Sequence, residues 1–499
     1  MRILLIAPPF YQFIGFYNRY FPLGLAYLAA VLKERGHEVS VYDSDTNINP
    51  DKMNFAVLEQ SYPKYLKAVA DEAHPVFEGI KQKLNKFNPE LIGISAWTTY
   101  VASSMKTAEI CKKWNASVPV VMGGPHISIK GEELLRICAD VDVLVRGEGE
   151  ETLPELATLL QTKKFIPDEL KKVNGIAFRA PEGITTTPDR EFARNLDAMP
   201  FPARDLLVHK DAYDCEDMGL LMTTRGCPFA CTYCATTIWG RKVRSRSIAN
   251  IIEEVKSVAA RYGTKQFAFK DDSFTINRAR TLAFCEALIK EHLNINWECN
   301  ARVDSLDAEL LARMRKAGCN SIKVGIETGS ERILKLVNKN ITLEQCRQAA
   351  KALRDSGIHW TAYFMIGLPT ETKEDMNKTL SFMKELRPDF ASLSVYEPFP
   401  GTKLYDIGVE MGLVCPERTR EDYFTISPKY YYVKNVMHRI DTMPEEEFVR
   451  VEAEIKCEFR RYNLSFTRLA RRALSRTGVY LNRPSILFSD IKKFLAYVS

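Results

Sequence analysis

The chain has 499 residues, 46% hydrophobic and 26% charged, with a formal net charge of +6. This composition excludes a disordered chain and is typical of a globular protein long enough for two or three domains. The opening MRILLIAPPF predicts a β-strand rather than a signal peptide, and no apolar run approaches the ~18 residues of a membrane span. Most of the 12 cysteines stand apart, so no disulfide framework is predicted. We therefore expect a cytoplasmic protein.

Residues 1–190 alternate strand and helix patterns. Alternation of this kind predicts a parallel sheet with helices on both faces, a Rossmann-like or flavodoxin-like arrangement. A polar, proline-rich passage at 191–215 then indicates a linker. The apolar runs that predict strands lie at residues 3–7, 39–43, 91–96, 118–123 and 141–145.

A second alternating series occupies residues 216–425. Six βα units in about 200 residues indicate a full or partial (β/α)6 barrel of the TIM type, whose chemistry belongs at the carboxyl ends of its strands. Helical periodicity dominates afterwards, so residues 426–499 are expected to form a mostly α-helical domain. The six predicted strands lie near residues 220–224, 266–270, 295–299, 321–326, 361–366 and 391–395.

Three cysteines, Cys227, Cys231 and Cys234, are crowded into the stretch RGCPFACTYCATT directly after the first strand of the predicted barrel. A zinc site usually takes four protein ligands, and no second pair stands near this one, so zinc is disfavoured. A [4Fe–4S] cluster normally takes four thiolates, so three cysteines leave one iron open to an exogenous ligand. The motif therefore predicts an iron–sulfur cluster with an open iron.

The spacing Cys-x3-Cys-x2-Cys, with Tyr233 before the last cysteine, resembles the radical S-adenosylmethionine (SAM) superfamily. The resemblance implies that the three cysteines bind a [4Fe–4S] cluster and that SAM binds its open iron. It places Tyr233 against the adenine of SAM. In this family an electron from the cluster cleaves SAM to give a 5′-deoxyadenosyl radical.

The same resemblance assigns further SAM-binding residues at the ends of later strands. Asp271 and Asp272 in FKDDSFT match the position that meets the SAM amino group, although the pair is also suited to capping the next helix. Arg302 in NARVD is a candidate partner of the SAM carboxylate, with a structural salt bridge as the alternative. Glu327 in VGIETGS matches a carboxylate near the SAM ribose.

Two more positions of the barrel follow from the resemblance. Gly367, in YFMIGLPTET, lies in the segment whose backbone meets the adenine. Tyr396, in SVYEPFPGTKLYD, follows the sixth strand and is the candidate catalytic residue facing the active-site cavity.

The first 160 residues contain four blocks, PLGLAYLAAVLKERGHEVSVYD, GISAWTT, VMGGPH and VRGEGEETL, that resemble the cobalamin-binding domain preceding the barrel in one radical SAM class. No GxGxxG follows the first strand, so a nicotinamide cofactor is not expected. A surface histidine at a helix start is the alternative for His126. The candidate cobalamin-binding residues are Pro22, Gly24, Trp97, Thr98, Thr99, Gly123, Gly124, His126, Gly147, Glu148 and Gly149.

The lower face of the cobalt is expected to lack a histidine ligand. Methionine-synthase-like proteins supply that histidine from a DxHxxG motif, whereas Asp43 here is followed by Ser44, Asp45 and Thr46. Residues 97–100 are candidates to line this face instead. An open lower position favours moving a methyl group to and from cobalt.

The activity implied by the resemblance is methylation of an unactivated carbon, or a phosphinate phosphorus, with methylcobalamin and a 5′-deoxyadenosyl radical. The alternative within the class is an oxidative cyclase similar to the anaerobic magnesium-protoporphyrin monomethyl ester cyclase. An RNA methylthiotransferase is disfavoured, because its extra cluster cysteines and RNA-binding barrel are not visible. A cobalamin or redox sensor with a degenerate barrel is disfavoured by the intact cysteine motif.

The partners expected are a small-molecule, lipid-like or peptide substrate and an external one-electron reductant, flavodoxin or ferredoxin, with no nucleic acid. The stretch LSFTRLARRALSRTGVYL, residues 464–481, is basic and amphipathic. This pattern suits peripheral contact with a membrane, and equally a solvated helix packed on the barrel.

Overall fold

The computed structural model describes residues 1–14, 21–46, 58–434, 440–465, 468–469, 488 and 491. Contacts divide the chain into two compact units. The first consists of Met1–Met218 with Glu417–Tyr431, and the second of Gly219–Pro416 with Tyr432–Ser499. None of the helices in the described part is long and apolar enough to cross a membrane.

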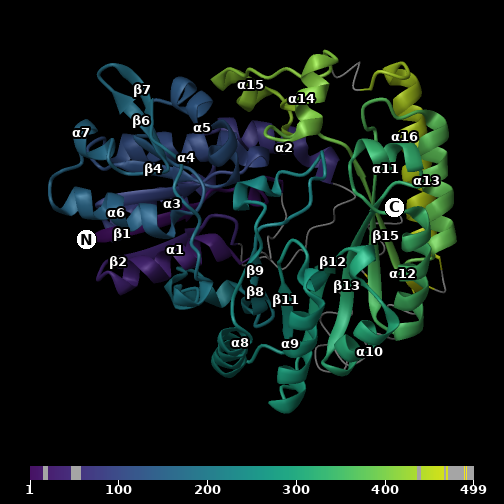
Figure 1. Ribbon diagram of the computed structural model, residues 1–499. Helices are drawn as coiled ribbons and strands as arrows, with labels where there is room; N and C mark the ends of the chain where they lie inside the picture. Colours follow the sequence, from purple (N-terminus) through teal and green to yellow (C-terminus); the bar gives the residue numbers. More distant parts are fainter. Residues whose placement is uncertain are drawn as a thin grey trace. The chain divides into compact units, whose positions relative to one another are not determined.

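The first unit is built on a seven-stranded sheet in the order β2-β1-β3-β4-β5-β6-β7 (Figure 1). Neighbours among β1 to β5 pair in parallel, which confirms the predicted Rossmann-like sheet. These strands are almost entirely buried, so they read as continuous apolar runs rather than alternating ones. The bounds are β1 Arg2–Ala7, β2 Glu38–Asp43, β3 Leu91–Ser95, β4 Val120–Gly123 and β5 Val143–Val145.

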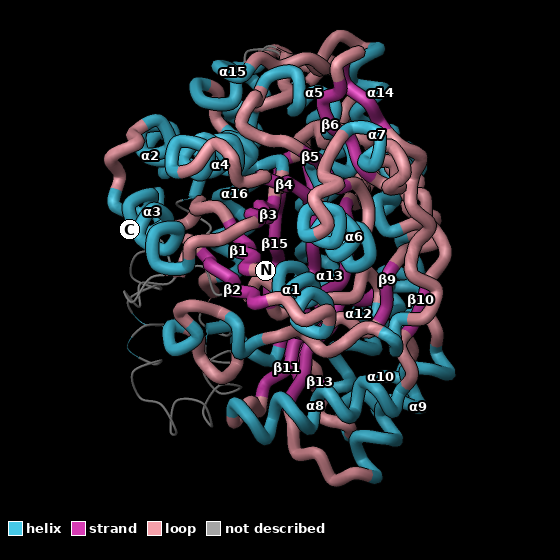
Figure 2. Tube along the Cα trace, turned by 90° about the vertical axis from the view of Figure 1, so that its left-hand side faces the viewer, coloured by secondary structure: helices cyan, strands magenta, loops and turns pink. Residues whose placement is uncertain are grey.

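Helices cover both faces of this sheet. Figure 2 shows α1 and α6 on one face and α3 and α4 on the other. In such a sheet, ligands bind outside the carboxyl ends of the strands, where the strand order reverses. The helices are α1 Leu23–Glu34, α2 Leu58–Ala70, α3 Pro75–Phe87, α4 Val101–Trp114, α5 Pro125–Ile137 and α6 Gly149–Gln161.

A hairpin that the sequence did not indicate completes the sheet: β6 (Ile176–Ala180) and β7 (Gly183–Thr186) run antiparallel. The passage expected as a linker, residues 191–215, then folds back on the unit. The Ala203 N–H donates to the Ala26 carbonyl at 3.0 Å, and the Val208 N–H donates to the Val41 carbonyl at 2.9 Å. Its prolines fix an extended path along α1 and β2 rather than a free tether.

The second unit is built on a six-stranded, all-parallel sheet in the order β8-β11-β12-β13-β14-β15, which confirms the predicted partial barrel. Consecutive strands are neighbours, so all six carboxyl ends lie at one edge. The strands are β8 Leu220–Leu221, β11 Gln266–Phe269, β12 Asn296–Ala301, β13 Cys319–Glu327, β14 His359–Ile366 and β15 Phe390–Val395.

Helices connect these strands, and a two-residue ladder of β9 with β10 follows β8. The elements are β9 Thr224–Arg225, β10 Arg244–Ser245, α8 Ile248–Tyr262, α9 Arg278–Lys290, α10 Ala308–Lys316, α11 Glu331–Leu336, α12 Leu343–Ser356, α13 Lys373–Leu386 and α14 Lys403–Glu410.

Helix α16 (Glu445–Asn463) packs against α13 and β15 (Figure 1). The Asn463 side chain accepts from the Ala391 N–H at 2.9 Å and donates to the Ala391 carbonyl at 2.7 Å, so it occupies backbone groups of the edge strand β15. Contacts group this helix with the barrel rather than in a body of its own. The basic stretch at 464–481 lies almost wholly outside the described residues.

Candidate functional site

The loop of three cysteines is held tightly where it leaves β9. Gly226 has φ +94°, and a Cβ added there would lie 2.5 Å from the Lys242 carbonyl oxygen. The Cys227 N–H donates to the Gly240 carbonyl at 3.2 Å. Glycine is therefore required at 226 both for its backbone angle and for the close approach of residues 240–242.

The opposite side of the same loop is fixed by two segments distant in sequence. The Asn338 side chain donates to the Ala230 carbonyl at 2.9 Å, and the Thr232 N–H donates to the Val337 carbonyl at 3.0 Å. The Leu404 N–H, in α14, donates to the Thr232 carbonyl at 2.8 Å. The loop is thus a rigid support for the cysteines rather than a free connection.

The three thiols are half-buried and lie close enough to influence one another. Burial raises the pKa of the Cys227 and Cys231 thiols, while the charges of Lys339 and Arg302 act to lower the pKa of Cys231. In the described part of the chain, no three His, Cys, Asp or Glu side chains converge on a single metal ion. Three thiolates spread around one loop fit a four-iron cluster, which is a larger body than one ion.

Lys339 is a site residue that sequence reasoning missed. Its ammonium lies 2.6 Å from the Glu327 carboxylate and 3.3 Å from the Tyr233 hydroxyl, and both Lys339 and Glu327 are buried. The signal available in the sequence was the NKN stretch, since Asn338 and Asn340 adopt the left-handed angles that asparagine tolerates. The contact with Glu327 itself is tertiary.

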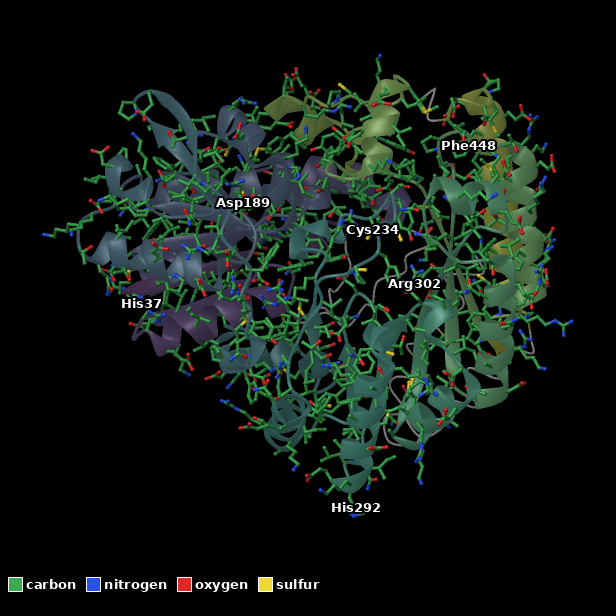
Figure 3. All side chains as sticks on the ribbon, in the orientation of Figure 1. His37, Asp189, Cys234, His292, Arg302 and Phe448 are labelled. Atoms are coloured by element: carbon green, nitrogen blue, oxygen red, sulfur yellow. The ribbon has the colours of Figure 1, made fainter. Side chains whose placement is uncertain are left out.

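Arg302 unites the two roles that the sequence left open. Its guanidinium forms a two-bond ion pair with Asp304, 3.0 Å for each bond, and donates to the Lys339 carbonyl at 2.8 Å. It also stacks 3.6 Å from the Phe229 ring centroid, inside the cysteine loop. Figure 3 labels Arg302 and Cys234. The structural salt bridge is real, and it holds the cation beside the loop.

The two aspartates after β11 have different surroundings. Asp271 is buried and accepts from the N–H groups of Thr223 (2.6 Å) and Thr224 (3.1 Å). Helix α9 is capped by Asn277, so the expectation that the aspartates cap this helix is wrong. Asp272 is exposed, and the surrounding protein together with the Asp271 charge raises its pKa to about 6.

Gly367 lies at the turn after β14, with φ +78°. A Cβ there would lie 2.9 Å from the ring of Phe448 in α16, which Figure 3 labels. Two N–H groups, of Gly367 and Leu368, donate to one oxygen of Glu371 at 2.6 and 3.0 Å. Sequence reasoning did not single out Glu371, because its partners are backbone groups of its own turn.

Tyr233 and Tyr396 pack against one apolar cluster, although they come from opposite ends of the barrel sequence. This shared packing brings the candidate adenine contact and the candidate catalytic tyrosine to the same part of the unit. The cluster consists of Ile333, Val337, Met365, Leu368 and Leu404.

Glu371 predicts a pH dependence of stability. Burial raises its pKa to about 8, so the folded state holds a proton that the unfolded chain releases near pH 4.5. The free energy of unfolding should therefore fall as pH rises between these values. Relative to wild type, Glu371→Gln, which cannot ionise, should gain about 2 kcal/mol in unfolding free energy between pH 6.5 and 8. Denaturant unfolding of both proteins at the two pH values measures this, and parallel pH profiles would contradict it.

In the first unit, candidate residues gather at the carboxyl ends of β3 and β4. Trp97 is 52% exposed, and the Thr98 hydroxyl lies 3.2 Å from Nδ1 of His126. Gly124 has φ +117°, and a Cβ there would lie 2.7 Å from the Ala96 carbonyl oxygen. The loops after two neighbouring strands are therefore in close contact below an exposed indole. Gly123, at the end of β4, and Thr99, beside Thr98, lie on the same edge.

His126 is buried in α5, so the expectation of a surface histidine is wrong. Burial lowers its pKa to about 3, which leaves the imidazole neutral. Its ring lies 6.2 Å from that of Tyr423, edge to face. Tyr423 belongs to α15 (Arg420–Thr425), a return segment after the barrel that contacts group with the first unit, whereas the sequence placed residues 417–425 with the barrel.

The remaining candidates lie around the starts of α1 and α6. Pro22 precedes α1, and Gly24 in its first turn is exposed, with no atom within 4 Å of an added Cβ. Gly147 is equally open and donates its N–H to the Ser128 hydroxyl at 3.0 Å. Glu148 is buried and accepts from the Ala193 N–H at 2.8 Å. Gly149 begins α6, where its added Cβ would lie 3.1 Å from Leu28.

The position that replaces a motif histidine is engaged within the protein. The Asp45 carboxylate accepts from the N–H groups of Phe10 (2.8 Å) and Gln12 (3.0 Å). The neighbouring Asp43 carboxylate accepts from the Tyr213 hydroxyl. Burial raises the pKa of both carboxyl groups. The pair ties the loop after β1 and the segment near 213 to the end of β2.

Comparison with known proteins decides the family. Residues 14–157 match the B12 binding domain, and residues 221–383 match the radical SAM superfamily. An uncharacterized methyltransferase of Pyrococcus horikoshii is 33% identical over 434 residues, which are 86% of this chain and 87% of that protein. This chain is a B12-binding member of the radical SAM superfamily.

Two further proteins place this B12-binding radical SAM enzyme among its relatives. The anaerobic magnesium-protoporphyrin IX monomethyl ester cyclase of Rubrivivax gelatinosus is 29% identical over 413 residues, 81% of this chain and 69% of the cyclase. The solved structure of the radical SAM methyltransferase TsrM from Kitasatospora setae, with cobalamin and a [4Fe–4S] cluster bound, superposes with a TM-score of 0.66. It is 17% identical and covers 92% of this chain and 88% of that one, a likeness of fold.

The residues present fit the cofactors of this family. The exposed indole of Trp97 and the open glycines 24 and 147 suit a large, mostly neutral ligand such as cobalamin at the edge of the first sheet. The three thiols of the second unit suit the cluster, and the cations of Arg302 and Lys339 beside them suit an anionic group such as the SAM carboxylate.

The return segment offers a test of the cobalamin side. The Tyr423 hydroxyl donates to Glu133 at 3.2 Å, and the Arg420 guanidinium lies 2.8 Å from Glu109. Because Tyr423→Phe removes only the hydrogen bond and retains the ring against His126, it should lower the free energy of unfolding by about 1 kcal/mol. Hydrogen exchange of residues 417–431 should rise in this variant, and unchanged exchange would contradict a docked segment.

Proposed function

We propose that this enzyme transfers a methyl group to an unactivated carbon, or to a phosphinate phosphorus, of its substrate. The observation that supports this most is the pairing of two cofactor-fitting sites in a chain that aligns over most of its length with a protein named a methyltransferase. When bound, the cluster and SAM supply a 5′-deoxyadenosyl radical, and cobalamin supplies a transferable methyl group. The two chemistries explain why one chain needs both units.

In this proposal the second unit binds and orients SAM. Cys227, Cys231 and Cys234 hold the cluster. Asp272, the exposed carboxylate of its pair, meets the SAM amino group, and Arg302 meets the SAM carboxylate.

Other residues orient the rest of SAM. Tyr233 and the backbone at Gly367 contact the adenine, and Glu327, oriented by Lys339, faces the ribose. Tyr396 excludes water beside the substrate through its packing on the same apolar cluster as Tyr233.

The first unit binds cobalamin in the same proposal. Trp97, Thr98 and Thr99 line the lower face of the corrin without supplying a histidine ligand. Loops at the ends of β4 and β5 receive the nucleotide tail, with neutral His126 as a hydrogen-bonding group rather than a charge. These cofactor-binding positions are Pro22, Gly24, Gly123, Gly124, Gly147, Glu148 and Gly149.

Product analysis tests the proposal. The protein is reconstituted anaerobically with iron, sulfide and hydroxocobalamin, reduced in the presence of SAM carrying a deuterated methyl group, and analysed by mass spectrometry. We expect both 5′-deoxyadenosine and cobalamin bearing the deuterated methyl. If 5′-deoxyadenosine forms while cobalamin is never methylated, methyl transfer is overturned.

That second outcome favours the alternative function, an oxidative cyclase or another non-methylating radical reaction. The relative from Rubrivivax gelatinosus, a cyclase aligned over 81% of this chain, is the observation behind it. The two functions share every cofactor, so methylated cobalamin distinguishes them and 5′-deoxyadenosine does not.

The proposal extends to partners and location. The substrate is a small molecule, lipid-like compound or peptide, and the electron comes from a flavodoxin or ferredoxin in the cytoplasm, without nucleic acid. The basic stretch at 464–481 is suited to touching an anionic membrane. Sedimentation with vesicles of anionic and of neutral lipid measures that contact.

A further inference from the structure

The cysteine loop presents one side to solvent. Pro228 and Ala230 are exposed, while Cys227, Phe229 and Cys231 between and beside them are half-buried. An electron donor that approaches these residues meets the cluster ligands through a single layer of backbone. The charge of the surrounding side chains therefore decides which donor this surface attracts.

Two cations are fixed at one margin of the exposed side. Arg241 and Lys242 are both exposed, and their backbone is pinned to the loop because the Cys227 N–H donates to the Gly240 carbonyl at 3.2 Å. The Arg241 guanidinium itself donates to the Phe229 carbonyl at 3.1 Å. Both charges therefore move with the cysteine loop instead of lying on an independent segment.

The other margin has matched charges. Lys335 and Lys403 are exposed beside the segments that bond to Ala230 and Thr232, and Glu331 and Asp406, also exposed, lie one turn from them. The positive excess around the cysteine loop therefore comes from Arg241 and Lys242.

We propose that the exposed side of the cysteine loop, with Arg241 and Lys242 at its margin, is the docking surface for an acidic one-electron carrier protein. This inference rests on the proposed function, which requires one electron for each SAM cleaved. In the step, the reduced carrier loses one electron and the cluster gains it, with no atom transferred. Opposite charges speed such an encounter and orient it, and salt weakens the effect.

The test measures cluster reduction, which needs neither SAM cleavage nor substrate. Reconstituted wild type, Lys242→Glu and Arg241→Glu/Lys242→Glu are mixed in a stopped-flow instrument with a reduced, acidic flavodoxin, and the cluster absorbance is followed. Each charge reversal should slow reduction at low ionic strength by about 5-fold or more, and high salt should abolish the difference. Reduction by titanium(III) citrate, a small molecule, should remain unchanged.

The matched control reverses Lys290 and Lys316, exposed residues at the ends of α9 and α10 that precede β12 and β13, at the opposite edge of the sheet. This control should reduce at the wild-type rate with both donors. Equal rates for wild type and Lys242→Glu with flavodoxin would overturn the docking surface. Slower reduction of the variants by titanium as well would also overturn it, because the residues would then act on the cluster and not on the carrier. Failure of the proposed function appears separately, as a cluster that reduces normally without cleaving SAM.

Discussion

Cys231→Ala should abolish 5′-deoxyadenosine formation while leaving cobalamin bound. Cys231 is half-buried between backbone anchors on both sides of its loop, so its thiolate has no mobile neighbour to replace it. With two cysteines left, the cluster loses a ligand that the open iron does not supply. The first unit, with its own sheet, should retain cobalamin because its internal packing does not use this loop. Iron content, product mass and the cobalamin absorbance of one preparation measure the three effects.

Cys457→Ala is the matched control, since Cys457 is the exposed cysteine of α16. It should keep the iron content and the 5′-deoxyadenosine yield of wild type. A Cys231→Ala protein that still cleaves SAM would contradict the assignment of the cluster. One that loses cobalamin together with iron would contradict the independence of the two sites.

Much of the fold was predictable because parallel strands buried on both faces leave an unmistakable pattern. The apolar runs of the sequence fall on β1 to β5 and on the six strands of the barrel. The hairpin of β6 and β7 was not predicted, because its strands lie at the margin of the sheet and mix polar with apolar residues. Its pairing depends on β5, which supplies the neighbour that local pattern does not show.

The site was predictable where chemistry is local in sequence. Three cysteines in eight residues announce a cluster by spacing alone. Lys339 and Tyr423 were missed for the opposite reason. Lys339 meets Glu327 only after α11 has turned the chain back, and Tyr423 meets His126 across 297 residues of sequence. A lone lysine or tyrosine in a polar stretch gives no sign of such a partner.

The boundary between units shows the same limit. The sequence placed residues up to 425 with the barrel because its strands end shortly before. Contacts instead group Glu417–Tyr431 with the first unit, where Arg420 pairs with Glu109. Nothing in the composition of this segment distinguishes a return to an earlier sheet from a surface loop. The predicted domain boundaries therefore remain predictions about where the motifs stop.

Lys339→Met should damage both stability and SAM cleavage. The substitution removes the partner of Glu327 and leaves a carboxylate buried without its cation, which typically costs about 3–5 kcal/mol in unfolding free energy. It also removes one of two cations that act on Cys231. Residues that orient cofactor ligands commonly change activity by about 10- to 100-fold, so 5′-deoxyadenosine formation should fall by a comparable factor.

A double-mutant cycle separates the ion pair from mere packing. If Lys339→Met harms the protein because it isolates Glu327, then Glu327→Gln in the same chain should restore part of the lost unfolding free energy, with a coupling of about 0.5–3 kcal/mol. Lys335→Met, an exposed lysine one turn earlier, is the control and should stay within about 0.5 kcal/mol of wild type. Additive losses would mean that Lys339 and Glu327 act independently despite their 2.6 Å contact. Restored stability without restored SAM cleavage would show that the ammonium acts at the cluster and SAM as well as on the fold. Stability and chemistry meet at this residue because the same cation neutralises a buried carboxylate and faces the thiolate of Cys231.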